Sequence, residues 1–292
     1  MNSPLQPLWT IYEQLVQDAP SPAGVFALWR GAHVASALHE APLTLGTDAE
    51  RRVFLLRNPG LDRPTVTHTL VAGVQLLLPG EHAPVHRHSQ SGLRVMLSGA
   101  AQMTVGERTL SVQPGDLVVL PALVAHGHAN TSDEAARWLD VLDVPTVGFL
   151  RATFSSDGGT PPSPRTSGGL LLGRDDTALG RGQEHPALGL VRRYRPSPDG
   201  GDVLPAIRAT QHRLRSFTGV QYRSTSSAVW VVLDGEVEVR IGEDVHRVGP
   251  ADVFVTPNWT RFALSCPGEA TVLCLSDAPL LDTLELLYEE VG

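Results

Sequence analysis

The chain has 292 residues, of which 42% are hydrophobic, so it is long enough for one large domain or two small ones. Its formal charge of −8 argues against a nucleic-acid partner, because binding phosphates requires a clustered basic face. No segment reaches the roughly 20 apolar residues of a membrane span, and no signal peptide is expected from the first residues. With only Cys266 and Cys274, no disulfide framework is expected, and a cytoplasmic location follows as the default.

The spacing of apolar residues changes once in the first half of the chain, from a helical to a strand-like pattern. Residues 1–50 predict a helical arm, because apolar residues recur at helical spacing in 8–16 and again in 24–40. Residues 51–150 consist of short β-branched and apolar runs separated by Gly, Pro, Asn and Asp, as in VFLLRNPG and LRVMLSG. Many short strands at this spacing are typical of a β-sandwich or barrel.

The second part begins with a segment of different composition. Residues 151–190 are rich in Ser, Gly, Pro and Thr, which predicts a linker. The strand pattern then resumes, so residues 191–292 are expected to form a second β domain. Within it, residues 278–291 have the amphipathic pattern of a C-terminal helix, and Asp277 is a possible N-cap.

Three histidines carry the strongest functional signal. His86 and His88 are one residue apart, and His126 follows in the same β segment. Residues at i and i+2 of a strand face the same side, so these imidazoles can be presented together. Neutral imidazole suits first-row transition metals, and three nitrogen ligands leave positions open for substrate and oxygen. A purely structural role is the weaker alternative, because three inward histidines would all need polar partners.

The two β segments form an internal repeat. A shift of 136 positions superimposes turn glycines and strand-end residues, namely Gly99 on Gly235, Gly106 on Gly242, Asp116 on Asp252 and Pro121 on Pro257. This recurrence predicts two copies of one barrel. In the second copy, Tyr222, Ser224 and Phe262 stand where His86, His88 and His126 stand in the first. We therefore expect a metal-free second barrel that serves packing and oligomer contacts.

These motifs resemble the cupin superfamily. Its first motif, G-x5-H-x-H followed by a glycine, matches Gly80, His86, His88 and Gly99. Its second matches Gly115, Pro121, His126 and Asn130, with Leu123 where a glycine is usual. Many cupins have a glutamate ligand shortly after the second histidine, where this chain has Gly92 and Leu93. The resemblance implies an all-β bicupin of two double-stranded β-helix (jelly-roll) barrels with an N-terminal helical arm and a C-terminal helix.

More narrowly, the chain resembles the bicupin ring-cleaving dioxygenases of gentisate, salicylate and 1-hydroxy-2-naphthoate. The similarity includes PLWTIYEQL, AERRVFLLRNPGL, GVQLLLPGEHAPVHRHSQSGLR, HGHAN and WLDVLDVP, and it is poorest in 152–190. The resemblance implies a mononuclear Fe(II) held by three histidines, and tetramers are common in this family. The residues that match the family's functional positions are His86, His88 and His126 for iron, His128 and Asp140 for catalysis, and Arg94, Gln75 and one of Arg51 and Arg52 for binding the substrate.

The residues themselves leave some of these roles open. Burial of Arg94 costs free energy unless its charge is paired, and a bound carboxylate would be a suitable partner. The alternative is an internal ion pair with Asp140 or Glu81. An adjacent Asp140 would raise the basicity of His128 and fix its tautomer, although a hydrogen-bonded core histidine is equally expected. Gln75 has Gln211 as its counterpart in the ligand-free repeat, which favours a packing role.

The expected activity is gentisate 1,2-dioxygenase, which converts gentisate and O2 to maleylpyruvate. Its partners would be a small aromatic acid, O2 and further copies of this chain. The alternatives are a non-catalytic or regulatory bicupin that binds a metal and an aromatic acid, or a different cupin metalloenzyme. An open first barrel would favour the enzyme, whereas a plugged one would favour the regulatory protein.

Overall fold

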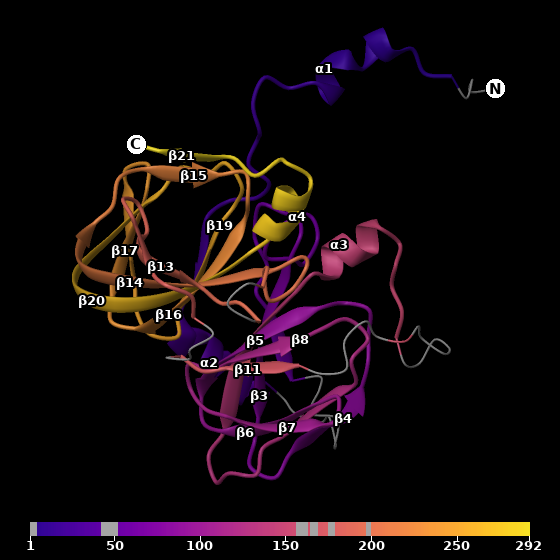
Figure 1. Ribbon diagram of the computed structural model, residues 1–292, viewed down its shortest axis with the longest axis vertical. Helices are drawn as coiled ribbons and strands as arrows, with labels where there is room; N and C mark the ends of the chain where they lie inside the picture. The colour runs from indigo at the N-terminus through magenta and orange to yellow at the C-terminus, as the bar shows by residue number, and fades with distance from the viewer. Residues whose placement is uncertain (1–4, 42–51, 156–162, 164–168, 175–178, 197–199) are drawn as a thin grey trace.

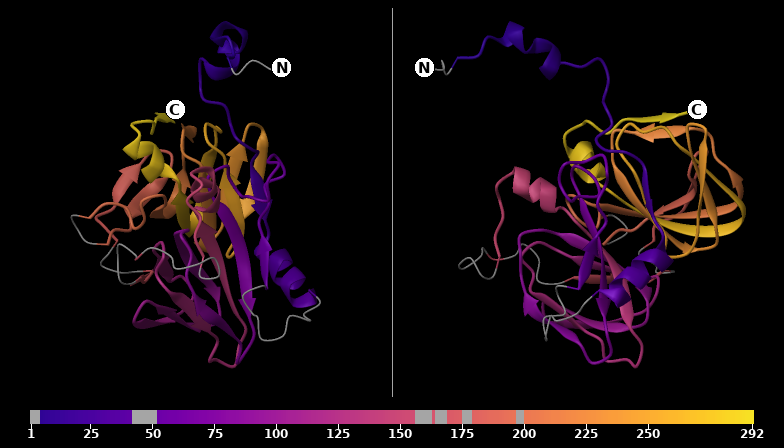
Figure 2. Two further views of the ribbon diagram at one scale, coloured as in Figure 1. Left: turned by 90° about the vertical axis from the view of Figure 1, so that its right-hand side faces the viewer. Right: turned by 180° about the vertical axis from the view of Figure 1, so that it is seen from behind.

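Two β-barrels lie against each other in the computed structural model, which describes residues 5–41, 52–155, 163, 169–174, 179–196 and 200–292 (Figure 1). The helical segments are η1 (Leu8–Thr10), α1 (Tyr12–Leu15), α2 (Gly31–Glu40), α3 (Val144–Phe149) and α4 (Ala278–Thr283). An arm that carries η1 and α1 extends away from both barrels (Figure 2). None of the described helices is long and apolar enough to cross a membrane.

The first barrel is formed by two antiparallel sheets. The larger sheet has the order β11 (Leu170–Leu172), β8 (Leu117–Leu120), β5 (Gly92–Ser98), β10 (Ala136–Leu142), β3 (Val71–Leu77) and β2 (Val53–Leu55). The smaller sheet has the order β4 (His82–His86), β9 (His126–Ala129), β6 (Ala101–Val105) and β7 (Arg108–Val112). The sequence-based prediction of an all-β domain is therefore confirmed for this segment.

The second barrel has the same plan. Its main sheet has the order β1 (Ala27–Trp29), β19 (Val253–Thr256), β16 (Ala228–Asp234), β20 (Ala263–Ser276), β14 (Arg208–Thr218), β13 (Gly189–Arg193) and β12 (Gln183–His185). In the same sheet, β17 (Val237–Ile241) pairs with β20 and with β18 (Asp244–Val248). A separate pair, β15 (Tyr222–Ser224) and β21 (Glu289–Val291), crosses one end of the barrel (Figure 1).

The two large sheets share one core. Leu93 and Val95 of β5 belong to the same buried cluster as Val229 and Val231 of β16. Alternate residues of these strands face the other way, so that Arg94 of β5 and Trp230 of β16 point into their own barrels. Strands buried on both faces require nearly continuous apolar sequence, as LRVML and AVWVV have. The rigid wall between the barrels thus positions one side of each interior.

The internal repeat is reproduced by the strands. β5, β6, β7 and β8 begin 136 residues before β16, β17, β18 and β19, respectively. The register differs on the neighbouring strands, however. Arg94 lies opposite Asp140, which lies opposite Gly73, whereas Trp230 lies opposite Cys274, which lies opposite Thr210.

This register corrects one sequence-based equivalence. Gly73 and Thr210 occupy equivalent positions, so Gln75 corresponds to His212 and not to Gln211. The second copy has one residue fewer between this strand and β16, since Gly73 lies 21 positions before Arg94 and Thr210 only 20 before Trp230. Such a slip turns every side chain to the opposite face. The proposed counterpart Gln211 therefore says nothing about the role of Gln75.

The helix expected over 24–40 is wrong in its first part. Residues 27–29 form β1 at the edge of the second barrel, and α2 begins only at Gly31. Phe26 and Leu28 pack on the core of the second barrel, while Trp29 packs on the core shared by both barrels. A short apolar run of this kind is ambiguous in sequence, and pairing with β19 makes it a strand.

Two further expectations are corrected near the ends of the second half. The segment 151–190 is not only a linker, because β11 joins the first barrel and β12 joins the second. The helix expected over 278–291 ends at Thr283, after which the chain continues into β21. Asp277 precedes α4, but its carboxylate binds the Ser227 N–H and the Thr69 hydroxyl instead of capping the helix.

Candidate metal centre and active site

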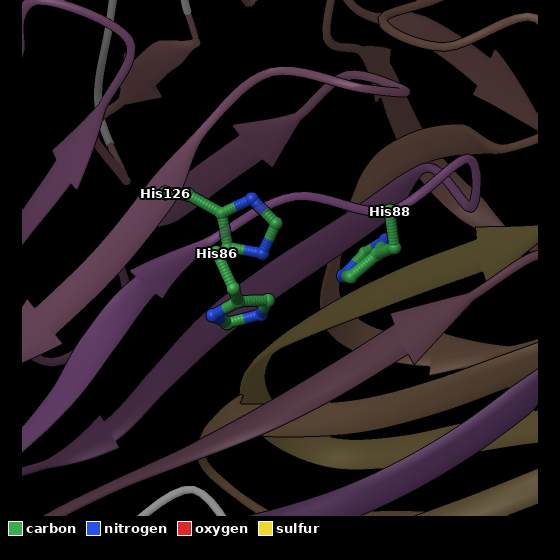
Figure 3. A group of neighbouring side chains, drawn as sticks. All are labelled: His86, His88 and His126. Carbon is green, nitrogen blue, oxygen red and sulfur yellow. The ribbon is translucent and has the colours of Figure 1, made fainter. Parts of the chain in front are cut away.

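Three imidazoles of the first barrel point toward one another (Figure 3). His86 ends β4 and lies opposite His126 at the start of β9, with ring centroids 4.5 Å apart. His88 lies beyond the end of β4, so one continuous strand does not carry both histidines, yet its ring is only 4.8 Å from that of His126. The candidate ligand nitrogens all lie within 4.8 Å of one another.

The backbone determines which nitrogen of each ring faces the centre. Nδ1 of His86 lies 3.0 Å from the Pro84 carbonyl, and Nδ1 of His126 lies 2.9 Å from the Val124 carbonyl. Nδ1 of His88 lies 2.9 Å from the carbonyl of Gln90. A carbonyl only accepts, so each Nδ1 carries the proton and each Nε2 keeps its lone pair. Such contacts are the usual way in which proteins orient metal-binding histidines, and these three rings fit a transition metal bound through Nε2.

The electrostatics of the cluster favour neutral rings. Burial lowers the pKa of His126 to about 3, and the nearby His88 contributes in the same direction. Burial also lowers the pKa of His88, with a further contribution from His86. Because a metal binds only the neutral imidazole, protons compete weakly for this site at neutral pH.

A cavity of about 330 Å³ opens in front of the three histidines. Its polar lining includes Gln75, Arg94, His128 and Asp140, and its apolar lining includes residues of β2 and β3 such as Val53. The volume lies at the lower end of the roughly 300–1,000 Å³ typical of small-molecule sites. The first barrel is thus open, which is the arrangement expected of an enzyme.

Arg94 and Asp140 form a buried ion pair inside this cavity. Arg94 Nε donates to Asp140 Oδ1 at 2.6 Å, and Nη2 donates to Oδ2 at 3.2 Å. Trp138 Nε1 donates to the same Oδ2 at 3.1 Å. Asp140 therefore neutralises Arg94 within the protein, so that burial of the guanidinium does not by itself require a bound carboxylate. Both side chains nevertheless line the cavity.

His128 contacts Arg94 rather than Asp140. Arg94 Nη1 lies 3.1 Å from His128 Nδ1, and Gln75 Nε2 lies 3.1 Å from His128 Nε2. Arginine only donates, so Nδ1 accepts and the ring proton sits on Nε2. The Gln75 amide must then turn its oxygen toward Nε2, since the two amide orientations are not distinguished by shape.

The predicted effect of Asp140 on His128 is reversed. Burial lowers the pKa of His128 well below its ordinary value, and the positive charge of Arg94 lowers it further. Arg94 stands between His128 and Asp140, so His128 meets the positive member of the ion pair. His128 is therefore a neutral hydrogen-bonded ring at neutral pH.

The structure describes only one of the two arginines that were predicted to bind an anion. Arg52 is buried and forms a two-pronged ion pair with Glu81, and it does not belong to the lining of the cavity. Burial would raise the pKa of Glu81, but the hydrogen bonds from Arg52 and from the Leu78 N–H outweigh it and lower the pKa. Arg51 lies outside the described residues.

Some residues of the site were missed from the sequence. Trp138 orients Asp140, and Leu120 and Leu142 contribute apolar walls to the cavity. Trp138 is two residues before Asp140 on β10, so strand parity would have placed it on the same face. The apolar wall residues carry no such signal, because any strand of a barrel contains leucines.

Comparison with known proteins extends these observations to the whole chain. The family model described as "Cupin domain" matches residues 73–142, which span the three histidines. A gentisate 1,2-dioxygenase of Streptomyces sp is 32% identical, covering 99% of this chain and 92% of that protein. A 1-hydroxy-2-naphthoate 1,2-dioxygenase of Nocardioides sp. (strain KP7) is 31% identical, covering 97% and 83%.

A solved structure agrees with these relatives. The crystal structure of a salicylate 1,2-dioxygenase from Pseudaminobacter salicylatoxidans matches with a TM-score of 0.87 and 27% identity, covering 99% of this chain and 94% of that one. Because similarity of this degree runs through both barrels, the chain belongs to the bicupin family of gentisate, salicylate and 1-hydroxy-2-naphthoate 1,2-dioxygenases and is a ring-cleaving dioxygenase.

Proposed function

We propose that this protein is an Fe(II)-dependent gentisate 1,2-dioxygenase. The observation that carries the proposal is the convergence of His86, His88 and His126 on a cavity that also contains Arg94. The reaction breaks the ring bond between the carbon that bears the carboxylate and the carbon that bears the neighbouring hydroxyl. Both oxygen atoms of O2 enter maleylpyruvate, so no additional reductant is consumed.

The residues present suit ferrous iron and a hydroxybenzoate together. Iron bound by His86, His88 and His126 would supply the redox-active centre that lets ground-state O2 react with an aromatic ring. An imidazole binds a metal in its neutral form, and Arg94 balances Asp140, so the protein would add no net charge to the metal site. The two positive charges of the metal would then be neutralised by an aromatic acid that carries two negative charges, one on its carboxylate and one on its deprotonated hydroxyl.

Arg94 is proposed to hold the substrate carboxylate. Its Nη2 group has two hydrogens and gives one to Asp140, which leaves one for a ligand in the cavity. Asp140 accepts a hydrogen bond from Arg94 Nε and so fixes the guanidinium plane. It is a positioning residue in this proposal. A fixed donor of this kind places the ring before oxygen reacts, which is the main contribution of positioning to catalysis.

His128 and Gln75 are proposed to orient the same region. His128 keeps a proton on Nε2 and accepts from Arg94 on Nδ1, so it holds both Arg94 and Gln75 in place. Any proton transfer by His128 would have to begin by donation from Nε2. Arg51 stays a predicted anion-binding residue, whereas the pairing of Arg52 with Glu81 favours a structural role.

Oxygen uptake provides the direct test. Metal-free protein loaded anaerobically with ferrous iron is expected to consume one O2 for each gentisate. His126→Ala should lower this rate by at least about 100-fold, because one ligand and the orientation of the metal are lost. His82→Ala is the matched control, since His82 is an exposed histidine of the same β4 and should leave the rate unchanged.

The same experiment separates the alternatives. Salicylate and 1-hydroxy-2-naphthoate are compared with gentisate, and the proposal requires gentisate to have the largest kcat/KM. If none of the three acids supports oxygen uptake, the proposed activity is wrong. A change in the ferrous protein's spectrum with gentisate but without oxygen uptake would instead identify a regulatory bicupin.

Self-association belongs to the same proposal. The N-terminal arm projects from the barrels and exposes Leu5 and Trp9, each 82% exposed, together with Leu15 at 62% (Figure 2). Apolar side chains exposed in this way are typical of contact surfaces. We propose that the arm packs against another copy of this chain, which light scattering would detect. The tetramer and the cytoplasmic location stay predictions.

A further inference from the structure

The second barrel contains a larger cavity than the one at the histidine cluster. Its volume is about 900 Å³, compared with 330 Å³ in the first barrel. It occupies the interior between β12, β13, β14, β16 and β20, and β15 and β21 contribute to its lining. The cavity occupies the same place in the repeat as the metal site does in the first barrel.

A barrel kept only for packing would not contain such a space. Protein interiors are close-packed, and unfilled space in a core is destabilising. Tyr222 and Phe262 fill the ligand positions, and Trp230 and Cys274 replace the ion pair of Arg94 and Asp140. Despite the three aromatic side chains among these replacements the interior stays hollow, which indicates a space that accommodates a ligand.

One side of the cavity is rich in arginine. Four arginines contribute to the lining, namely Arg181, Arg193, Arg195 and Arg208. Arg193 and Arg208 share the carboxylate of Asp202, and Arg208 also contacts Asp282. In both arginines the Nη1 group has no hydrogen bond to any residue that the structure describes.

Two of these arginines have no acidic partner among the residues that the structure describes. Within the described ranges, Arg181 forms no ion pair, and Arg195 donates only to the Gly200 carbonyl at 3.1 Å. Even when Asp202, Asp282 and the lining residue Glu289 are all counted, the positive charges exceed the negative ones. Guanidinium donors that are left over in a concave site are suited to a carboxylate or a similar anion.

Another part of the lining is largely aromatic, with Glu289 as its acidic member, which accepts a hydrogen bond from the Tyr222 hydroxyl at 2.5 Å. Trp230 and Phe262 lie 5.8 Å apart between ring centroids, and Tyr222 packs on Phe262 at 5.6 Å. Burial lowers the pKa of His212 to about 4, and burial raises the pKa of the Cys274 thiol to about 12, so both are neutral at pH 7. This part of the lining would accept the apolar body of a ligand, and Glu289 would disfavour a second negative charge there.

We propose that the second barrel binds an organic monocarboxylate with an aromatic or other bulky apolar body. The carboxylate contacts the free guanidinium donors of Arg195 and Arg193, and the body lies against Trp230 and Phe262. The site is separate from the metal centre and needs no metal. The degenerate barrel is thus a second ligand-binding domain and not only a packing partner.

The test uses 1-naphthoate, which has no neighbouring hydroxyl and therefore cannot chelate a metal as a hydroxybenzoate does. Isothermal titration of the full-length, metal-free protein should show saturable binding. Arg195→Gln should weaken this binding by at least about 10-fold, because a charged donor to the carboxylate is lost. Arg240→Gln is the matched control, since it removes the same charge from an exposed position of β17 and should have no effect.

A second variant tests the space itself. Thr260 lines the cavity, and no hydrogen bond of its side chain to a described residue is observed, so Thr260→Trp should fill the interior and abolish binding. His126→Ala, in the first barrel, should leave the affinity unchanged. The neutral analogue 1-naphthalenemethanol and inorganic phosphate should each bind at least about 10-fold more weakly than 1-naphthoate.

The outcomes that overturn the proposal are distinct from those that overturn the dioxygenase. Binding that is unaffected by both Arg195→Gln and Thr260→Trp, or that is lost in His126→Ala, places 1-naphthoate elsewhere and refutes the site. Phosphate that binds as tightly as 1-naphthoate refutes the apolar-carboxylate class. Failure of oxygen uptake with gentisate leaves all of these results unchanged, because the titrations use metal-free protein.

Discussion

Ser91 and Asp143 hold each other by two hydrogen bonds at the edge of the metal-binding barrel. The Ser91 N–H donates to Asp143 Oδ1 at 2.8 Å, and the Asp143 N–H donates to the Ser91 carbonyl at 3.1 Å. Ser227 and Asp277 repeat the arrangement in the second barrel, with corresponding distances of 2.8 and 3.2 Å. The pair ties the segment after His88 to the end of β10, and its recurrence shows that this lock belongs to the barrel rather than to the metal.

The lock predicts a pH-dependent stability. Burial raises the pKa of Asp143 to about 6, and the hydrogen bond from Ser91 only partly offsets this effect. The unfolded chain releases the same proton near its ordinary pKa of about 3.9. Between these values the folded chain binds more protons than the unfolded chain, so the free energy of unfolding falls as pH rises and then stays reduced above about pH 6.

Asp143→Asn should remove this loss, since the amide oxygen still accepts from Ser91. We expect the variant to be more stable than the parent by about 1–3 kcal/mol at pH 8 and to differ little at pH 4. Urea unfolding of metal-free protein between pH 4 and 8 measures the difference. Asp133→Asn, at an exposed position, is the control, and equal pH slopes for parent and Asp143→Asn would contradict the prediction.

The ion pair inside the first barrel should be strongly coupled. Arg94→Met leaves the Asp140 carboxylate without its cation, and Asp140→Asn leaves the guanidinium without its anion. Each single change is expected to cost about 3–5 kcal/mol of unfolding free energy, because it leaves an uncompensated buried charge. The double variant should lose less than the sum by about 2 kcal/mol.

Activity gives this cycle a second measurement. Arg94→Met should raise the KM for gentisate, because its charged donor to the carboxylate is gone, whereas Asp140→Asn should reduce kcat/KM by misplacing a guanidinium that is still present. Strictly additive stability losses would show that the two side chains act independently. An unchanged KM in Arg94→Met would remove Arg94 from substrate binding.

The imidazole tautomers provide a test that needs neither metal nor substrate. In metal-free protein at pH 8, His86, His88 and His126 should carry their protons on Nδ1, because each Nδ1 faces a carbonyl. His128 should carry its proton on Nε2, because Arg94 donates to its Nδ1. Long-range proton–nitrogen NMR of histidine-labelled protein distinguishes the two forms. A proton on Nε2 of His126 would contradict the proposed ligand atom.

The hairpin glycines of the repeat should differ in their tolerance of a side chain. At Gly235, with φ +76°, an added Cβ would lie 2.0 Å from the Glu269 carbonyl oxygen, whereas at Gly242, with φ +60°, nothing lies within 4 Å. Gly242→Ala should cost about 1–2 kcal/mol from the left-handed backbone alone. Gly235→Ala should cost clearly more, since backbone atoms must move. Thermal unfolding of the two variants compares these costs, and equal losses would refute the steric argument.

The fold could be predicted to a large extent because its signals are local and repeated. The shift of 136 residues aligned four strands of one barrel with four of the other, since turns and strand ends depend on neighbouring residues. The same shift failed for Gln75, because the second copy has one residue fewer between β14 and β16, and sequence periodicity does not show which strands pair. The helical spacing of apolar residues was misleading at 27–29, where pairing with β19 at the edge of the second barrel made a strand of an apolar run.

Most polar members of the candidate site could be predicted, but the hydrogen bonds between them could not. The spacing of the histidines and the family pattern identified the polar residues that line the first cavity, but they also named Arg52, which pairs with Glu81 and does not belong to the lining. The sequence did not show which atoms of these residues contact one another. Arg94 stands between His128 and Asp140, so that the pKa of His128 is lowered where a raised value was expected.

The sequence by itself determined the class of fold, the duplicated barrel and the three nitrogen donors, because each of these is written in the spacing of residues along one chain. Only the tertiary structure decided that an arginine of one strand is neutralised by an aspartate of the next, and that the barrel without the three-histidine cluster encloses the larger space. Charge pairing and empty volume depend on which distant side chains meet and how completely they fill the interior, and no local pattern of residues specifies either.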